Sequence, residues 1–362
     1  MDRWLLHGPS RFVASVLDAV RDGSNVVIGA SVHAAADLPA LLEARIAENH
    51  NAVVISSPQH FDPIDAIYEA LDLSGGGVMS RSVASLLSAF QRPEMIIVDF
   101  VDEARWGPWK TFLADYESAS RSVLAMDRTQ FIVCVRGVPK AQLSQRAPAL
   151  EVFTWAGHIS EFDVLSYVIE RLRAQQGRVD QKSKLMARII HRLAAWDLDL
   201  VDQLIALPWD RLFDPLRALD LIANGDTRIP LGKSWEAGGC CEVDGVLTMH
   251  ALQLRASGDP GQELRMRLWA AQASELLPVL EIKRRKLAER IKCLNKVPLD
   301  ARVNDEVVQD VLEVEIGGLA YLTRRYALPP DICRLAETLR DYRNKLAHLT
   351  PLTADEALDL LQ

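Results

Sequence analysis

The sequence has few cysteines, no long hydrophobic run and no excess of basic residues, and each absence excludes a class of protein. Five cysteines among 362 residues are too few for a disulfide scaffold, and no pair has the CxxC spacing of a structural zinc site. The longest apolar runs fall well short of the roughly 20 residues that span a bilayer. The formal net charge of -8 excludes a basic coat for nucleic acid along the whole chain.

The remaining composition is that of an ordinary globular protein. Hydrophobic residues make up 49% of the chain and charged residues 25%, which excludes disordered and collagen-like chains. Residues 1–11 lack the apolar core of a signal peptide. We therefore expect a cytoplasmic protein with reduced thiols and with no metal, cofactor or membrane contact. The length predicts two or three domains.

The first half of the chain alternates helical and strand patterns, which predicts an α/β domain at residues 1–175. An amphipathic helix is predicted at 10–20 and a second helix at 37–47, and short apolar strands are predicted at 26–28, 52–55, 95–98, 131–135 and 151–155. Continuous apolar strands that are separated by helices predict a parallel sheet covered on both faces.

The second half of the chain is predominantly helical in pattern. A polar stretch at 174–184 is typical of a linker, and a helical middle domain is predicted at 185–258. Long helical patterns at 262–291 and 331–349 predict a C-terminal helical bundle, which we place at 260–362.

The order of strand, loop, helix and then an apolar strand ending in Asp99 resembles the layout of P-loop NTPases of the STAND or AAA type. Residues 29–36, Gly-Ala-Ser-Val-His-Ala-Ala-Ala, stand where a phosphate loop needs G-x-x-x-x-G-K-[ST]. They supply no Lys, no second Gly and no Ser or Thr at the metal-binding step. Residues 232–234, Gly-Lys-Ser, match the end of the motif but lack its spacing and its strand. The resemblance therefore implies a degenerate, inactive NTPase-like domain.

Two features follow the strand that ends in Asp99. Asp99, Asp102 and Glu103 form an acidic cluster, which holds a metal ion in one interpretation and consists of solvated loop carboxylates in the other, which we favour. Trp106 and Trp109 stand on a predicted loop, where aromatic side chains either stack on bases or pack over the edge of their own domain. We expect packing.

The C-terminal segment 339–349, Leu-Arg-Asp-Tyr-Arg-Asn-Lys-Leu-Ala-His-Leu, is the most informative part of the sequence. Arg343, four residues and then His348 form an R-x4-H pattern, with Asn344 directly after the Arg. This segment resembles the last core helix of the HEPN superfamily, whose signature is R-x(4–6)-H. The resemblance covers 260–362 and implies a helical fold, metal-independent RNA cleavage and a homodimer in which two motifs face each other.

The residue types of the motif suit RNA cleavage. Asn344 and His348 are i and i+4 on a helix and share a face with Arg340, whereas Arg343 is offset from it. His has an ordinary pKa of about 6.5, which suits general acid–base catalysis, and Arg offers a bidentate fork to phosphate. The resemblance implies that Arg343 stabilises the phosphorane, that His348 moves the proton and that Asn344 orients the phosphate or the His.

A basic run precedes the motif along the chain. Lys283, Arg284 and Lys286, together with Arg340, are candidate RNA contacts because clustered cations can follow a phosphate backbone. Ion pairs with neighbouring glutamates at helical spacing account for part of this run.

Two functions remain open from the sequence. One is a HEPN-type ribonuclease or RNA-binding effector, regulated by the inactive NTPase-like domain in a bacterial anti-phage or stress system. Its partners are RNA, a second copy of the chain and a protein from the same operon. The alternative is a non-enzymatic adaptor, in which both domains are degenerate and dock a partner ATPase or effector. In that case the motif residues tie helices together by hydrogen bonds. ATP hydrolysis at an unconventional site is the least favoured function.

Overall fold

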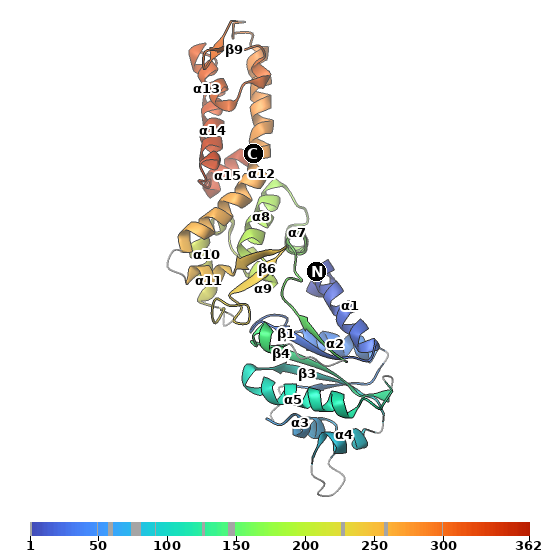
Figure 1. The fold of residues 1–362 in the computed structure, drawn as a ribbon. Helices are drawn as coiled ribbons and strands as arrows, with labels where there is room; N and C mark the ends of the chain where they lie inside the picture. The colour runs from blue at the N-terminus through green and yellow to red at the C-terminus, as the bar shows by residue number, and fades with distance from the viewer. Residues whose placement is uncertain are drawn as a thin grey trace. The chain divides into compact units, whose positions relative to one another are not determined.

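A computed structural model describes residues 2–48, 50–56, 61–73, 81–90, 92–124, 127–143, 149–225, 229–256, 260–298 and 300–362 (Figure 1). The chain divides into two compact units. The α/β unit comprises residues 2–163 and 226–253, and the helical unit comprises residues 164–225 and 254–362. The three-domain division expected from the sequence stays a prediction, and residues 226–253 belong here with the sheet rather than with the helices on either side.

A five-stranded parallel sheet forms the centre of the α/β unit, as the sequence predicted. Across the sheet the strands follow the order β2 (Ala52–Ile55), β3 (Met95–Val101), β4 (Gln130–Arg136), β1 (Asn25–Ala30) and β5 (Leu150–Thr154). β1 is buried along its whole length, and β4 is buried except at its last residue. This burial on both faces explains why the central strands are continuous apolar runs.

Helices cover both faces of the sheet (Figure 1). One face carries α1 (His7–Arg21) and α2 (Leu38–Ala47), and the other carries α3 (Pro63–Ala70), α4 (Val83–Ala89) and α5 (Glu103–Ala119). Alternate residues of β4 supply the two cores, because successive side chains of a strand point to opposite faces. Phe131 and Val133 pack toward α5, whereas Ile132 and Cys134 pack toward α1.

The two tryptophans that the sequence placed on a loop lie within α5. The exposed fractions of Trp106 and Trp109 are 2% and 0%, so the predicted packing is confirmed and the predicted loop is wrong. Asp102 caps the helix, since its carboxylate accepts a hydrogen bond of 3.0 Å from the Arg105 N–H. Pro108 concealed the helix from sequence reasoning, because proline normally breaks a helix interior.

The helical unit contains two long helices and several short ones. Its helices are α7 (Glu161–Gln176), α8 (Gln181–Ala194), α9 (Leu198–Ile205), α10 (Pro215–Ala223), α11 (Ala251–Arg255), α12 (Pro260–Cys293), α13 (Ile316–Arg325), α14 (Pro330–Ala347) and α15 (Ala354–Leu361); α7 and α11 begin within the α/β unit. The predicted linker at 174–184 is too long, because helices α7 and α8 leave only four residues between them.

Among the described helices, none has the length and apolar character that crossing a membrane requires.

The end of α14 is fixed by side chains of α12. The Trp269 indole N–H donates to the Leu346 carbonyl at 2.7 Å. The fully buried Gln272 amide donates to the Leu352 carbonyl at 3.0 Å and accepts from the Leu352 N–H at 2.7 Å. Between these anchors the chain reverses at Leu349 (φ +57°), where the helix ends in a left-handed turn. The last turn of α14 therefore has a defined position.

We expect Gln272→Leu to lower the free energy of unfolding by about 2–4 kcal/mol, because it leaves a buried N–H and a buried carbonyl of Leu352 without partners. Gln262→Leu, at an exposed position on the same helix, is the matched control and should change stability by less than about 0.5 kcal/mol. Urea denaturation followed by circular dichroism compares the two variants. Equal denaturation midpoints for both variants would show that the hydrogen bonds between Gln272 and Leu352 contribute nothing to stability.

Candidate functional site

The carboxyl ends of β1, β3 and β4 meet at one edge of the sheet. Parallel α/β sheets bind ligands at such an edge. The observed order places β4 between β1 and β3, which resembles the arrangement in AAA-type P-loop ATPases. This edge is therefore the place to test whether the α/β unit has room and ligands for Mg²⁺ and a nucleotide.

The loop after β1 is hydrogen-bonded to a later segment of the same unit, residues 229–239. The Val32 N–H donates to the Glu236 carbonyl at 3.0 Å, and the His33 imidazole Nε2 lies 3.1 Å from the Ile229 carbonyl oxygen. In a phosphate loop, backbone N–H groups of this kind point at the phosphates. Here the chain's own carbonyl uses the Val32 donor, and the Gly-Lys-Ser run belongs to this covering segment rather than to a phosphate loop.

The covering segment is packed into the unit. Trp235 packs against the core on the α5 side of the sheet, and the Lys140 ammonium lies 5.1 Å from the centre of its ring. Gly238 and Gly137 both have positive φ angles and both face Val32. A Cβ on Gly238 would lie 3.7 Å from the Val32 side chain, so the loop and its cover are in contact, and a Cβ on Gly137, after β4, would lie 3.0 Å from the same side chain.

The Asp99 carboxylate, which the resemblance assigns to Mg²⁺, has a guanidinium as its neighbour. A β-bulge interrupts β3 between Val98 and Val101 and gives Phe100 a φ of +21°. The Arg136 guanidinium stacks 3.6 Å from the centre of the Phe100 ring. Burial raises the pKa of Asp99 and the Arg136 charge opposes that shift, while burial lowers the pKa of Arg136. The positive charge of Arg136 therefore acts on this carboxylate from a distance, because no hydrogen bond or ion pair joins the two described side chains and Nε and Nη2 of Arg136 have no partner.

The other two carboxylates of the acidic cluster do not join Asp99. Asp102 caps α5 and Glu103 lies in its first turn, and both residues are exposed to solvent. Within the described ranges, no three His, Cys, Asp or Glu side chains are placed to hold a metal ion. The loop after β1 has no lysine, its Val32 amide is occupied and Arg136 acts on Asp99, so these residues do not fit Mg²⁺ and a nucleoside triphosphate.

The C-terminal motif stands on the last turn of α14 and on the residue that ends it. Arg343, Asn344 and His348 are all exposed, and the His348 N–H donates to the Asn344 carbonyl at 3.0 Å. No hydrogen bond or ion pair within the described residues uses the side chain of Asn344 or His348. The Arg343 guanidinium lies 3.8 Å from the Glu315 carboxylate, which is a loose ion pair. The three side chains are free to contact a ligand.

A different face of α14 is tied to α15. The Tyr342 hydroxyl donates to the Asp359 carboxylate at 2.9 Å, and the Lys345 ammonium pairs with Glu356. Burial and the bond with Asp359 raise the pKa of Tyr342 to about 12. The terminal helix therefore holds Tyr342 and Lys345 and leaves the motif face uncovered.

The structure separates the predicted basic residues from one another. Arg284 is engaged in the fold, because it pairs with Glu281 and donates to two backbone carbonyls, so we remove it from the candidate RNA contacts. Lys283 is half-buried, and Arg340 pairs with the adjacent Asp341 at 2.9 Å. The basic run therefore does not present one continuous surface.

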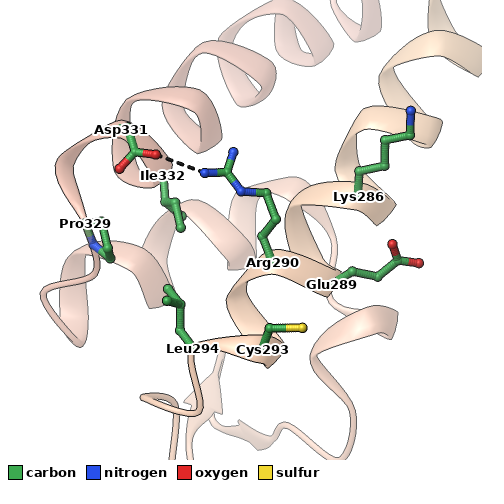
Figure 2. A pocket seen from close by; sticks show the side chains of 8 residues that line it. All are labelled: Lys286, Glu289, Arg290, Cys293, Leu294, Pro329, Asp331 and Ile332. Atoms are coloured by element: carbon green, nitrogen blue, oxygen red, sulfur yellow. Dashed lines mark hydrogen bonds and ion pairs between the residues drawn. The ribbon is translucent and has the colours of Figure 1, made fainter.

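Lys286 lies at a pocket near the opposite end of α14 from the motif (Figure 2). Asp331 stands on the first turn of α14 and forms an ion pair of 2.9 Å with Arg290 beside that pocket. Asp331 is twelve residues before Arg343, which corresponds to about 18 Å along a helix axis. Lys286 and the motif therefore do not form a single site.

Comparisons with known proteins give only remote likenesses. No protein family and no curated protein matched the chain. Among solved structures, a chain of Drosophila ORC bound to GC-rich DNA and Cdc6 matches 97% of this chain and 69% of its own length, at 12% identity and a TM-score of 0.30. The Thermotoga maritima RuvB Holliday junction branch migration motor matches 94% of this chain and 86% of its own length, at 11% identity and a TM-score of 0.30. Such low TM-scores add nothing to the strand order described above.

We expect Arg136→Met to destabilise the protein in a pH-dependent way. The pKa of Asp99 lies above its ordinary value of 3.8, so ionisation of this carboxyl weakens the fold as the pH rises through that range. Without the opposing Arg136 charge the pKa rises further. The loss of unfolding free energy should therefore grow between about pH 4 and about pH 7, to about 1 kcal/mol, since the carboxylate is partly solvated.

The control is the same substitution in an Asp99→Asn background, where no carboxyl titrates. There the effect of Arg136→Met should be the same at both pH values. Urea denaturation of the four proteins at the two pH values measures the coupling. A loss that does not depend on pH in the single variant would refute the proposed coupling of Asp99 with Arg136.

We also expect no binding of ATP in the presence of Mg²⁺, because the loop amide of Val32 is occupied and the loop after β1 has no lysine to hold the phosphates. Isothermal titration calorimetry of the full chain with ATP, with and without Mg²⁺, measures this directly. A saturable heat that Asp99→Asn abolishes would contradict the interpretation of this edge as inactive.

Proposed function

We propose that the helical unit cleaves RNA without a metal ion, with Arg343 and His348 of α14 as the catalytic residues. The observation that carries this proposal is the exposure of Arg343, Asn344 and His348 together at one helix end. Two of these side chains have no partner among the described residues. The resemblance of the motif to HEPN ribonucleases supports the same assignment of roles.

The setting of the motif suits catalysis because the helix end is rigid and its side chains are free. Trp269 and Gln272 fix the backbone on both sides of His348 through buried or half-buried hydrogen bonds. Catalytic groups work best when a rigid element holds them in position. Polar side chains that only tied helices together would show partners within the fold, and Asn344 and His348 show none among the described residues.

The chemistry is a transesterification within the RNA strand. A neutral His348 accepts the proton of the 2′-hydroxyl, and the 2′-oxygen attacks the adjacent phosphorus. The bond from phosphorus to the 5′-oxygen breaks, and that oxygen receives a proton from a protonated His348 of a second copy of the chain. The products are a 2′,3′-cyclic phosphate and a 5′-hydroxyl. Arg343 stabilises the charge on the phosphorane, and Asn344 orients the phosphate.

The second candidate function is that of an adaptor, and one observation favours it for the α/β unit. The chain's own segment 229–239 occupies the loop where a nucleotide would bind. A sheet edge that is filled in this way is a surface for docking rather than for hydrolysis. In this candidate the α/β unit docks a protein partner encoded in the same operon, which includes a partner ATPase, and no RNA is cleaved.

We expect His348→Ala to reduce RNA cleavage at least about 100-fold, because general acid–base catalysis contributes about that much or more. The substrate is a 5′-labelled RNA in the presence of EDTA, and the initial rate is read from a denaturing gel. His50→Ala, an exposed histidine in the α/β unit, is the matched control and should leave the rate unchanged. Arg343→Lys should retain part of the activity that Arg343→Ala loses.

Three results would count against the ribonuclease. The wild-type protein fails to cleave RNA in EDTA, His348→Ala cleaves as fast as wild type, or the product ends in a 3′-hydroxyl instead of a cyclic phosphate. The first of these would leave the adaptor as the better account.

A further inference from the structure

A cavity of about 410 Å³ lies beside Arg343, between α12, the start of α13 and α14. Its floor is apolar and consists of the buried side chains Leu280, Ile316 and Leu339. Its rim is charged, with Glu313, Glu315 and Arg343 around the opening. Glu281 and Arg284 also line the cavity, so charged side chains are more numerous here than in most small-molecule sites, although the volume is in their range.

The rim carboxylates are available to a ligand. Within the described residues, the Glu313 carboxylate has no hydrogen bond or ion pair, and the Glu315 side chain is 84% exposed, with a loose 3.8 Å contact to Arg343 and a longer-range attraction to Arg284. A carboxylate at neutral pH accepts hydrogen bonds and donates none. The cavity therefore suits a flat apolar body that presents hydrogen-bond donors at one edge.

The backbone that carries these carboxylates is held in place by Arg284. Its guanidinium donates to the carbonyls of Leu312 and Val314, at 2.9 Å each, and pairs with Glu281. The hydrogen bond from Arg284 lowers the pKa of Glu281, so that carboxylate remains charged and keeps its partner. Glu313 and Glu315 flank Val314, whose carbonyl Arg284 anchors. The backbone of both glutamates therefore has a fixed position, as ligand selection requires.

We propose that this cavity binds a nucleobase of the RNA next to the cleaved bond and prefers guanine. Guanine places two adjacent donors, N1–H and the 2-amino group, on the edge that would face Glu315, and its two faces are apolar enough for the floor. Adenine, cytosine and uracil each offer a single donor group on that edge. The inference rests on the proposed ribonuclease, because Arg343 both lines the cavity and belongs to the exposed motif.

Binding of mononucleotides tests the cavity without any need for cleavage. Isothermal titration of the full chain with GMP, IMP and UMP should give the order GMP, then IMP, then UMP. Inosine lacks only the 2-amino group, so GMP should bind roughly tenfold more tightly than IMP. Glu315→Gln should remove that difference, because the amide has an NH2 donor in place of the second oxygen and cannot pair side by side with two donors. Glu306→Gln, another exposed glutamate of the helical unit, should preserve it.

Cleavage tests the same preference in RNA. Oligouridine strands of about twelve nucleotides, each with a single G, inosine or A at one position, should be cut fastest beside G by the wild-type protein. Glu315→Gln should cut all three at the rate that wild type shows for A. Because Glu315 has no cap bond with its helix and is highly exposed, this variant is expected to fold.

The outcomes separate the cavity from the ribonuclease. RNA cleavage with equal rates beside G, inosine and A, together with equal binding of GMP and UMP, overturns the base site and leaves the ribonuclease intact. Selective GMP binding that Glu315→Gln abolishes, without cleavage of any strand, supports the base site and overturns the ribonuclease.

Discussion

The buried amide of Gln272 is the contact on which the motif depends most. It is fully buried, and it satisfies both hydrogen-bonding groups of Leu352, four residues after His348. Buried backbone groups must find partners, so the chain can leave α14 along only a narrow set of paths. With Trp269 bound to the Leu346 carbonyl, this fixes a turn in which Leu349 takes a left-handed conformation. The exposed motif side chains are thus held in position by buried hydrogen bonds on either side of His348.

The α/β unit combines a strand order that resembles that of AAA-type P-loop ATPases with an edge whose residues do not fit a nucleotide. The sheet order keeps β1, β3 and β4 together at one edge. At that edge the Glu236 carbonyl takes the amide of Val32 and the charge of Arg136 acts on Asp99. The Glu236 carbonyl accepts the hydrogen bond that a phosphate would accept, and the Arg136 guanidinium supplies the positive charge that a metal ion would supply. The compensation is incomplete, because Nε and Nη2 of Arg136 are buried without a partner and burial raises the pKa of Asp99.

The sequence predicted local patterns well and long-range partners poorly. All five strands of the sheet were found; the central ones stand out because strands buried on both faces are short Val- and Ile-rich runs between helices. The motif face of α14 followed from the spacing of Asn344 and His348. Helix α5 was missed because Pro108 signals a break, whereas the helix continues through this residue. Arg284 was misassigned because its backbone partners are 28 and 30 residues away, and no periodicity reports such a contact.

Arg343 and Glu315 connect the motif to the cavity, and the looseness of their contact is what makes a shared role feasible. An ion pair at 3.8 Å between solvent-exposed groups contributes at most about 1 kcal/mol. A phosphate can form two hydrogen bonds with Arg343, and a base edge that carries two donors can form two with Glu315. One RNA nucleotide that carries both groups would therefore exchange a weak internal contact for two stronger external ones. Neither side chain would be left uncompensated, and binding the base would place the adjacent phosphate against the arginine.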